Sequence, residues 1–353
     1  MKKLTAILSL ALSLCLLAGC MGTPVVYYCD CPTDGSTDTD TDTQAPVVGE
    51  GALKTGLAIV ANAKDSVGAT AETDGEAKYD VTIVAVLVDD NGVIRDCIID
   101  SIGTSVKFNA AGAITSDLSA EILTKNELGD NYGMKAYGGA KYEWYEQAAA
   151  LADFAVGKTV DELKNGAVGA DGKAVDVDLA STATIYLGGY VSAIEKAVAN
   201  AKHLGAQAGD VLKLASISSV GSSADAGEKD GTAQLDTDVT AITMKDDTIT
   251  SCFIDSLQAK VNFSATAEIT SDLTAFATKN ELGENYGMKA WGGAKYEWNE
   301  QAASFASYVT GKTAAEVAGI AVNEKTAPAD ADLSATVTIA IGGFQALIAK
   351  AAK

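Results

Sequence analysis

The sequence has almost no histidine and comparatively little positive charge. Among 353 residues there is one histidine, His203, and 26 lysines and arginines stand against 47 aspartates and glutamates, which gives a net charge of −21. One histidine cannot supply a histidine-ligated zinc site or a Ser-His-Asp triad in two places. A chain this acidic is repelled by nucleic acid and by anionic membrane surfaces, so the composition argues against nucleic acid as a partner.

The apolar stretch at the N-terminus is too short to span a bilayer comfortably. Lys2 and Lys3 precede it, and it ends in Leu17-Ala18-Gly19-Cys20. A positive start, a short apolar run and small residues before a cysteine resemble the signal peptide and lipobox of bacterial lipoproteins. We therefore expect residues 1–19 to be removed and Cys20 to carry a lipid. The lipid would anchor the protein to the cell membrane on its extracytoplasmic face.

The other cysteines fall into two groups. Cys29 and Cys31 lie near the low-complexity stretch TDGSTDTDTDTQAP (33–46), which cannot bury a core, so we expect a disordered, extended stalk there. Two thiols alone make a poor metal site, whereas an intermolecular or strained local disulfide is open to them. Cys97 and Cys252 occupy equivalent places in two similar β-rich segments. We expect them to be small buried side chains rather than a disulfide pair.

A long segment of the chain is repeated. TKNELGDNYGMKAYGGAKYEWYEQAA (124–149) recurs as TKNELGENYGMKAWGGAKYEWNEQAA (278–303), with three differences. Shorter segments agree in register outside this block. The pattern predicts an α+β fold that is a tandem duplication of one small domain, each copy an antiparallel β-hairpin or sheet packed with helices. The predicted divisions are a signal peptide (1–19), a lipidated stalk (20–52), a first domain (53–205) and a second domain (206–353).

Local signals place the elements within each copy. Asp90-Asn91-Gly92 joins two β-rich runs and predicts a hairpin. Apolar residues at helical spacing after Trp144 and Trp298 predict a helix in both copies. Capping boxes predict that a second helix follows, and they are formed by Thr159 with Glu162 and by Thr313 with Glu316.

The repeated block combines two glycine clusters, a methionine and several aromatic residues ahead of a helix. Core packing would explain Trp144, whereas an aromatic-rich loop is more typical of a binding surface. We therefore expect a flat ligand to stack against these side chains, while sugar binding and adhesion or wall attachment are the alternatives. The candidate residues are Tyr132, Met134, Tyr137 and Trp144 in the first copy, and Tyr286, Met288 and Trp298 in the second.

Each copy also has a hydroxyl-rich segment before its last expected helix. The first runs from Asp178 to Thr184 and the second from Asp332 to Thr338. Their hydroxyl and carboxyl groups could cap the helix. They could equally be attachment points, because a helix N-terminus suits a phosphate. A glycine pair follows each segment, and inside a helix such a pair costs about 1–2 kcal/mol, so we expect something to approach the backbone closely there.

The first hydroxyl-rich segment resembles the D-x-x-S-G-A-T flavinylation motif of the FMN-binding domain family. The resemblance covers about residues 53–353. It implies that the last threonine of each motif carries FMN through a phosphoester, and these residues are Thr184 and Thr338. A separate FAD:protein FMN transferase would install the group. Other motif positions are matched by Asp178, Ser181 and Asp332, whereas Ala335 and Val337 depart from the motif.

The combination of lipobox, stalk and two such domains is similar to the doubly flavinylated lipoproteins of Gram-positive extracellular electron transfer. The resemblance implies a membrane-anchored electron carrier with two covalent FMN groups, rather than an enzyme with its own substrate pocket. Electrons would arrive from membrane electron-transfer proteins or the quinone pool and leave to an extracellular acceptor such as ferric iron. The alternative is a surface lipoprotein that binds a glycan or another aromatic-stacking ligand, without covalent flavin.

Overall fold

The computed structural model describes residues 51–274 and 276–353, which belong to one compact unit. The predicted signal peptide and residues 20–50 of the predicted stalk, with Cys20, Cys29 and Cys31, lie outside the described residues. Within the described part, every helix is too short or too polar to cross a membrane. We refer to residues 53–205 as the first half and to residues 206–353 as the second half.

Each half contributes one three-stranded antiparallel sheet, with strand order β1-β2-β3 in the first half and β4-β5-β6 in the second. The strands are rich in valine, isoleucine and threonine, whose branched side chains favour extended backbone. Their bounds are β1 (Lys54–Asn62), β2 (Gly75–Val88), β3 (Ile94–Phe108), β4 (Val211–Ser219), β5 (Gly231–Lys245) and β6 (Thr248–Phe263).

Helices follow the sheet in both halves, in the same order. The first half has α1 (Lys125–Leu128), the 3₁₀ helix η1 (Gly129–Tyr132), α2 (Met134–Gly138), α3 (Trp144–Ala155), α4 (Val160–Ala167), α5 (Val177–Thr182) and α6 (Gly188–Ala199). The second half has α7 (Lys279–Leu282), the 3₁₀ helix η2 (Gly283–Tyr286), α8 (Met288–Gly292), α9 (Trp298–Val309), α10 (Ala314–Ala318), α11 (Ala331–Ser334) and α12 (Gly342–Ala351). The predicted α+β class, with antiparallel sheets packed with helices, is confirmed.

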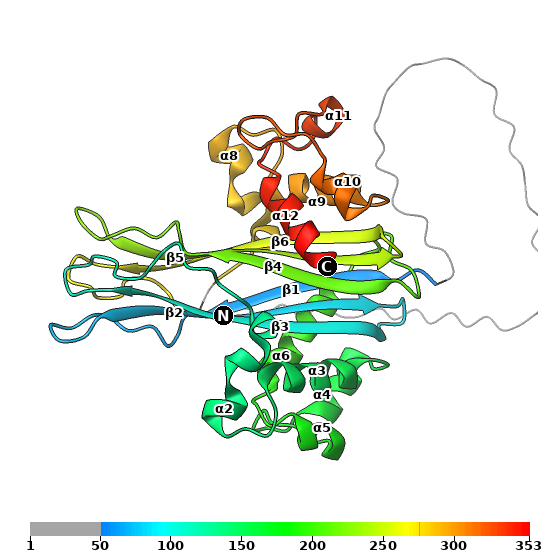
Figure 1. Cartoon of the computed structure of the whole chain (residues 1–353), viewed down its shortest axis with the longest axis horizontal. Coiled ribbons are helices and arrows are strands. Elements are labelled where there is room, and N and C mark those ends of the chain that lie inside the picture. The colour runs from blue at the N-terminus through cyan, green and yellow to red at the C-terminus, as the bar shows by residue number, and fades with distance from the viewer. Residues whose placement is uncertain (1–50, 275) are drawn as a thin grey trace, which may run out of the picture. The chain divides into compact units, whose positions relative to one another are not determined.

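The two sheets pack face to face around one shared apolar core (Figure 1). Phe108 and Phe263 stack across it with ring centroids 4.0 Å apart and planes 3° from parallel. The hydroxyl of buried Tyr79 in β2 donates a hydrogen bond of 2.7 Å to the carbonyl oxygen of Ala233 in β5. Because the inner face of each sheet is apolar, each sheet removes the other from water.

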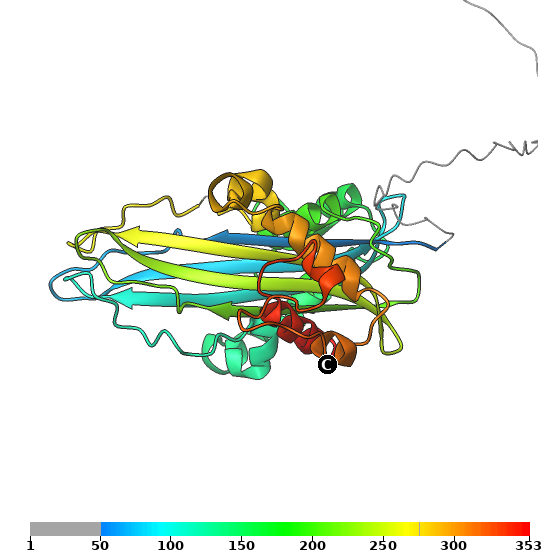
Figure 2. The same cartoon turned by 90° about the horizontal axis from the view of Figure 1, so that it is seen from above.

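Helices cover the outer face of each sheet. In Figure 1 the helices of the first half lie below the two sheets and those of the second half lie above them, and Figure 2 shows the same layers from another side. Each helical layer forms its own apolar core with the strands beneath it. In α3 the buried residues Trp144, Ala148, Leu151 and Ala155 recur at helical spacing, so one face of the helix packs on the sheet.

Two ion pairs join the halves reciprocally. Lys196 of α6 lies 2.5 Å from a carboxylate oxygen of Glu281 in α7. Lys350 of α12 pairs in the same way with Glu127 of α1. The last helix of each half is therefore tied to the first short helix of the other.

Several local predictions are confirmed. The turn between β2 and β3 contains Gly92 with φ of 77°, in the left-handed region that glycine tolerates. Both capping boxes predicted for the second helix are present, at the starts of α4 and α10. Cys97 and Cys252 are buried free thiols in separate outer cores. Burial raises the pKa of the Cys252 thiol to about 12, so it stays protonated at neutral pH.

Candidate functional site

Thr184 and Thr338 are exposed residues in short loops. They lie before the last helix of each half, as expected, but neither threonine adjoins its first residue. α6 and α12 begin four residues later, at Gly188 and Gly342. The reason is that the hydroxyl-rich segment forms a short helix of its own, α5 or α11, which ends before the threonine. Each threonine therefore lies between two helices.

The capping role considered for this segment falls to other residues. Asp176 and Asp330 are the N-caps of α5 and α11, and each carboxylate accepts two backbone N–H groups. Asp178 and Asp332 are exposed in the first turn of these helices. The hydroxyl of Ser181 donates a hydrogen bond of 2.7 Å to the carbonyl oxygen of Asp178. Thr184 and Thr338 are therefore not the N-cap residues of these helices.

A buried glutamine holds the loop of Thr184. Gln147 belongs to α3 and is fully buried. Its Oε1 accepts hydrogen bonds from the Thr184 N–H (2.8 Å), the Thr184 hydroxyl (3.1 Å) and the Ile185 N–H (3.1 Å). Its Nε2 donates to the carbonyl oxygen of Tyr142 at 3.0 Å. A buried amide that is satisfied at both ends fixes the backbone of the loop.

The second half repeats this arrangement. Gln301 is fully buried, and its Oε1 accepts from the Thr338 N–H (2.8 Å), the Thr338 hydroxyl (3.1 Å) and the Ile339 N–H (3.2 Å). Neither glutamine was predicted from the sequence to belong to the site. A polar residue on the apolar face of a helix, present in both copies of the repeated block, is the signal that could have found them.

A cavity of about 450 Å³ lies beside the loop of Thr184. Three candidate residues from the repeated block, Tyr132, Met134 and Trp144, line it together. Ile185, the neighbour of Thr184, lines it as well. Two further aromatic side chains, Tyr186 and Tyr190, also line the cavity. We call the four rings of Tyr132, Trp144, Tyr186 and Tyr190 the aromatic wall.

Trp144 serves both the core and the cavity. Only 3% of its surface is exposed, yet its Nε1 donates to the hydroxyl of Tyr190 at 3.0 Å, and the two rings meet edge-on with centroids 5.9 Å apart. In the second half Trp298 is also buried and meets Phe344 edge-on at the same centroid distance, 5.9 Å. Core packing and ligand contact are therefore compatible at this position.

A lysine lies over the aromatic rings in both halves. The Nζ of Lys125 is 5.1 Å from the ring centroids of both Tyr132 and Trp144. In the second half Lys279 is 5.3 Å from the ring of Tyr286 and 4.9 Å from that of Trp298. Such cation–π contacts fix the position of the charge. Neither lysine was predicted from the sequence to belong to the site.

Helix α1 presents Lys125, and a half-buried carboxylate anchors this helix. Asp100 in β3 accepts the backbone N–H of Asn126 at 3.1 Å, and the Asn126 side chain donates to the Ile99 carbonyl oxygen at 2.9 Å. Burial raises the pKa of Asp100 to about 6. Asp255 occupies the same place beneath α7, and burial raises its pKa to about 6 as well.

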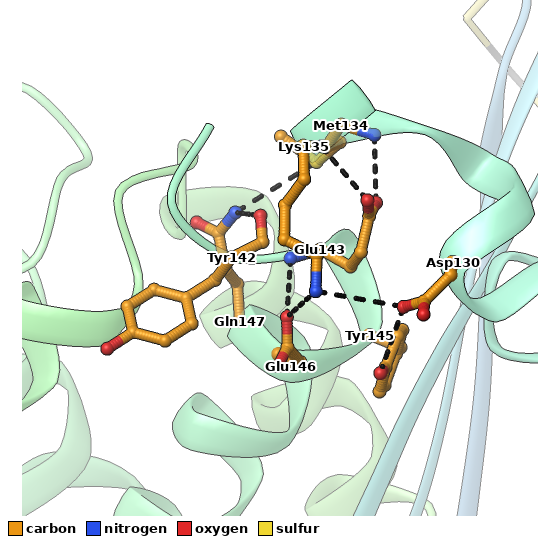
Figure 3. Close-up of polar contacts among 8 residues, drawn as sticks. All are labelled: Asp130, Met134, Lys135, Tyr142, Glu143, Tyr145, Glu146 and Gln147. Carbon is orange, nitrogen blue, oxygen red and sulfur yellow. Dashed lines mark hydrogen bonds and ion pairs between the residues drawn. The ribbon is translucent and has the colours of Figure 1, made fainter. Parts of the chain in front are cut away.

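A network of carboxylates fixes the loop that carries Met134 (Figure 3). Glu143 is buried and accepts the N–H groups of Met134 (2.8 Å) and Lys135 (2.9 Å). Glu146 accepts the N–H of Glu143 at 2.7 Å and lies 3.3 Å from the Lys135 ammonium. The first turn of α2 is thereby held against the start of α3.

Tyr137 does not belong to the cavity, although the sequence suggested it as a stacking residue. Its side chain is 92% exposed, and its ring lies over Gly133. The counterpart Trp291 is 83% exposed and lies over Gly287. These glycines have φ values of 82° and 83°, which turn the chain so that the ring folds back on the loop.

The glycine pair at the start of α6 also differs from the expectation. Gly188 and Gly189 are the first two residues of the helix rather than interior residues. The close approach at Gly188 comes from the Tyr186 ring, whereas the space beside Gly189 is open and Gly189 lines the cavity. The N-cap residue Leu187 offers no side-chain cap, and the equivalent Ile341 of α12 offers none either. Gly188 donates its N–H to the carbonyl oxygen of Gly172 at 3.2 Å, whereas Gly189 and Tyr190, which follow in the first turn of α6, both line the cavity.

In residues 51–274 and 276–353, no group of three or more histidine, cysteine, aspartate or glutamate side chains is placed to hold a metal ion. Comparisons of the chain with protein-family models, with curated proteins and with solved structures found no match.

Proposed function

We propose that the protein is a membrane-anchored, extracytoplasmic electron carrier with two FMN groups attached covalently through phosphoesters at Thr184 and Thr338. The observation that carries the proposal is the contact between glutamine and threonine in each half. A fully buried glutamine fixes the backbone of an otherwise exposed threonine. This arrangement suits a hydroxyl that must be both accessible to a modifying enzyme and precisely placed.

The residues around Thr184 fit FMN. The flat ring system of FMN would pack against the aromatic wall. The cavity volume of about 450 Å³ lies in the range of cofactor sites. Lys125 would attract negative charge on the reduced ring. The N-terminus of α6, which lacks a side-chain cap, would offer N–H groups to the phosphate. Aromatic surface, a cation and free amide donors are therefore present at one place.

The roles of the chain's own residues follow from these contacts. A bound FMN would supply the redox chemistry. The hydroxyl of Thr184 donates to Oε1 of Gln147, which orients the oxygen and leaves its lone pairs accessible. In the attachment step this oxygen would form the phosphoester bond to the FMN phosphorus of FAD. The pyrophosphate bond of FAD would break, AMP would leave, and the hydroxyl proton would be released. The FAD:protein FMN transferase would catalyse this step.

We also propose that residues 53–205 and 206–353 are two copies of one domain. The repeated block is nearly identical in sequence, and the elements follow one another in the same order in both halves. The same hydrogen bonds recur at Gln147 and Gln301 and around Asp100 and Asp255.

The cellular setting is part of the same proposal. A lipid on Cys20 would hold the protein at the outer face of the cell membrane. Membrane electron-transfer proteins or the quinone pool would deliver electrons, and an extracellular acceptor such as ferric iron would remove them. The motif at the N-terminus and the low-complexity stalk support this setting.

A glycan-binding lipoprotein is the second candidate, and one observation favours it. Tyr137 and Trp291 present nearly bare rings at equivalent positions. Exposed aromatic rings are suited to stacking on sugar rings. In that case both threonines would stay unmodified.

Co-expression with an FAD:protein FMN transferase distinguishes the two candidates. We expect the purified protein to be yellow and its intact mass to show two added FMN groups. The matched control is the Thr184→Ala/Thr338→Ala double variant, which should be colourless. A colourless wild-type protein without added mass would reject the flavin proposal.

A further inference from the structure

We infer that the two flavin sites differ in reduction potential, and that the site at Thr184 is the more oxidising of the two. This inference rests on the proposed function. Two charge differences between the sites carry it, one at the middle strand of each sheet and one just after its first strand. Electrons shared between the sites would then collect at the first.

The first difference lies on the middle strands. Thr82 of β2 lines the cavity of the first half. It stands seven residues after Gly75, which begins β2, and Asp238 stands seven residues after Gly231, which begins β5. Their partners also correspond, since Thr82 pairs with a serine in β3 and Asp238 with a serine in β6. A neutral hydroxyl in the first half is thus replaced by a carboxylate in the second.

Asp238 faces the second site. A methyl group built at Gly343, in the first turn of α12, would lie 3.8 Å from Oδ2 of Asp238. Gly343 is the counterpart of Gly189, which lines the cavity in the first half. Burial lowers the pKa of Lys279, and among the nearby carboxylates Asp238 opposes this lowering most. The carboxylate is therefore close to both the helix start and the lysine of the second site.

The second difference is a lost cation. Lys64 follows β1 by two residues and lines the first cavity, whereas the residue in the same place after β4 is Gly221. Two other charged positions are shared: Lys125 corresponds to Lys279, and Asp80 to Asp236. On the same strands Lys78 is replaced by Gln234 and its partner Ser105 by Lys260, so that pair keeps one cation in each half. The side-chain amides of Gln234 and Gln258 donate to Asp236, which disperses its charge. The first site therefore has one more positive and one less negative group.

These charges act in the same direction on a flavin. Reduction brings two electrons and at least one proton to the ring, so the ring gains negative character. A half-buried carboxylate disfavours that gain and a lysine favours it. Because Lys64 is exposed and screened by water, Asp238 is expected to be the larger influence.

Single-flavin proteins test the inference directly. Full-length Thr338→Ala and Thr184→Ala, flavinylated by the transferase, are titrated with dithionite and redox dyes while absorbance is followed. We expect a higher midpoint potential for Thr338→Ala, which retains the flavin at Thr184. Adding Asp238→Asn to Thr184→Ala should shift its midpoint upward, and adding Thr82→Asp to Thr338→Ala should shift its midpoint downward.

Glu228→Gln is the matched control, because it removes one negative charge from an exposed loop outside the site. It should leave the midpoint unchanged. Equal or inverted midpoints, or an Asp238→Asn shift no larger than that of Glu228→Gln, would overturn the inference while the flavin proposal stands. Absence of FMN from the intact mass would instead overturn the proposed function.

Discussion

The two halves hold their threonines in the same way but build one wall of the site differently. In the first half Tyr186 lies over Gly172, and a methyl group built on that glycine would come within 2.0 Å of its ring. In the second half the corresponding residues are Ala340 and Thr326. Thr326 has a positive φ of 58°, close to the 71° of Gly172.

This exchange shows which parts of the structure are variable. The loop keeps its backbone conformation even where a threonine must adopt it at some cost. The space that the tyrosine ring takes in one half is taken by a threonine side chain in the other. The glutamine, the lysine and the capping carboxylates do not vary. The scaffold that positions the threonine is therefore constant, while the wall around it is adjustable.

Replacing the threonines tests the constant part and should have the largest effect. Thr184→Ala should remove one covalent FMN and Thr338→Ala the other, because no other oxygen is presented in the same way. Intact mass and in-gel flavin fluorescence measure this loss. Thr182→Ala and Thr336→Ala are the controls. Loss of flavin with the controls alone would show that the attachment residue is a different one.

Replacing the buried glutamines should cost the most stability. Gln147→Leu leaves the N–H groups of Thr184 and Ile185 without their acceptor, which we expect to lower the free energy of unfolding by about 2–4 kcal/mol. FMN attachment at Thr184 should fall while attachment at Thr338 is kept. Gln147→Glu retains an acceptor oxygen, so it should keep much of the stability and much of the FMN attachment at Thr184. Urea unfolding measures the stability, and mass spectrometry of the two sites measures the attachment. An unchanged urea midpoint in Gln147→Leu would contradict the role of Gln147 in holding the Thr184 loop.

The carboxylates of Asp100 and Asp255 predict a pH dependence that both halves share. In the folded state Asp100 and Asp255 have pKa values of about 6, raised by burial above the 3.8 of an ordinary aspartate. Between these two pKa values the folded protein binds more protons than the unfolded protein. The contribution of the two aspartates to the free energy of unfolding therefore decreases as pH rises from about 4 to about 6. The expected decrease is about 1–3 kcal/mol for each residue.

Asparagine variants separate the two contributions. Asp100→Asn and Asp255→Asn should each remove one part of the decrease, and the double variant both parts. Urea unfolding between pH 4 and pH 7 measures the slope, with the exposed Glu121→Gln as control. If the single variants keep the wild-type slope, these two residues do not cause it.

The smallest predicted effect concerns the adjustable wall. Gly172→Ala should lower the free energy of unfolding by about 1–2 kcal/mol, because alanine disfavours a φ of 71° and its methyl group meets the Tyr186 ring. Adding Tyr186→Ala to Gly172→Ala should remove the contact with the ring but not the backbone strain, so it should restore part of the lost free energy of unfolding. Thr326→Gly in the second half should be neutral or stabilising. Additive losses in Gly172→Ala/Tyr186→Ala would contradict the proposed contact.

Local patterns in the sequence predicted much of the fold but only part of the site. The hairpin at Gly92 and the capping boxes of α4 and α10 depend on neighbouring residues, so the sequence alone could predict them. The shared core between the sheets depends on contacts such as that between Phe108 and Phe263, which lie far apart in the chain. No local pattern predicts which surface covers a sheet.

The site shows the same limit. The aromatic residues and the threonines were recognised because they fall in repeated segments. The roles of Gln147 and Lys125 could not be derived in advance, because each depends on a contact with a different element. The gap between Thr184 and the last helix was not predicted, because Asp176, rather than a later residue, caps the hydroxyl-rich segment and gives it a helix of its own.

The stacked rings of Phe108 and Phe263 have a consequence for the way the protein is made. The inner face of the first sheet is complete once β3 has been synthesised, but its cover needs β4, β5 and β6, which end at Phe263. At about 5–20 residues per second, the intervening chain takes roughly 8–30 s to appear. During that time the nascent first sheet presents an apolar surface without its partner, which is the condition under which chaperones bind and neighbouring chains aggregate.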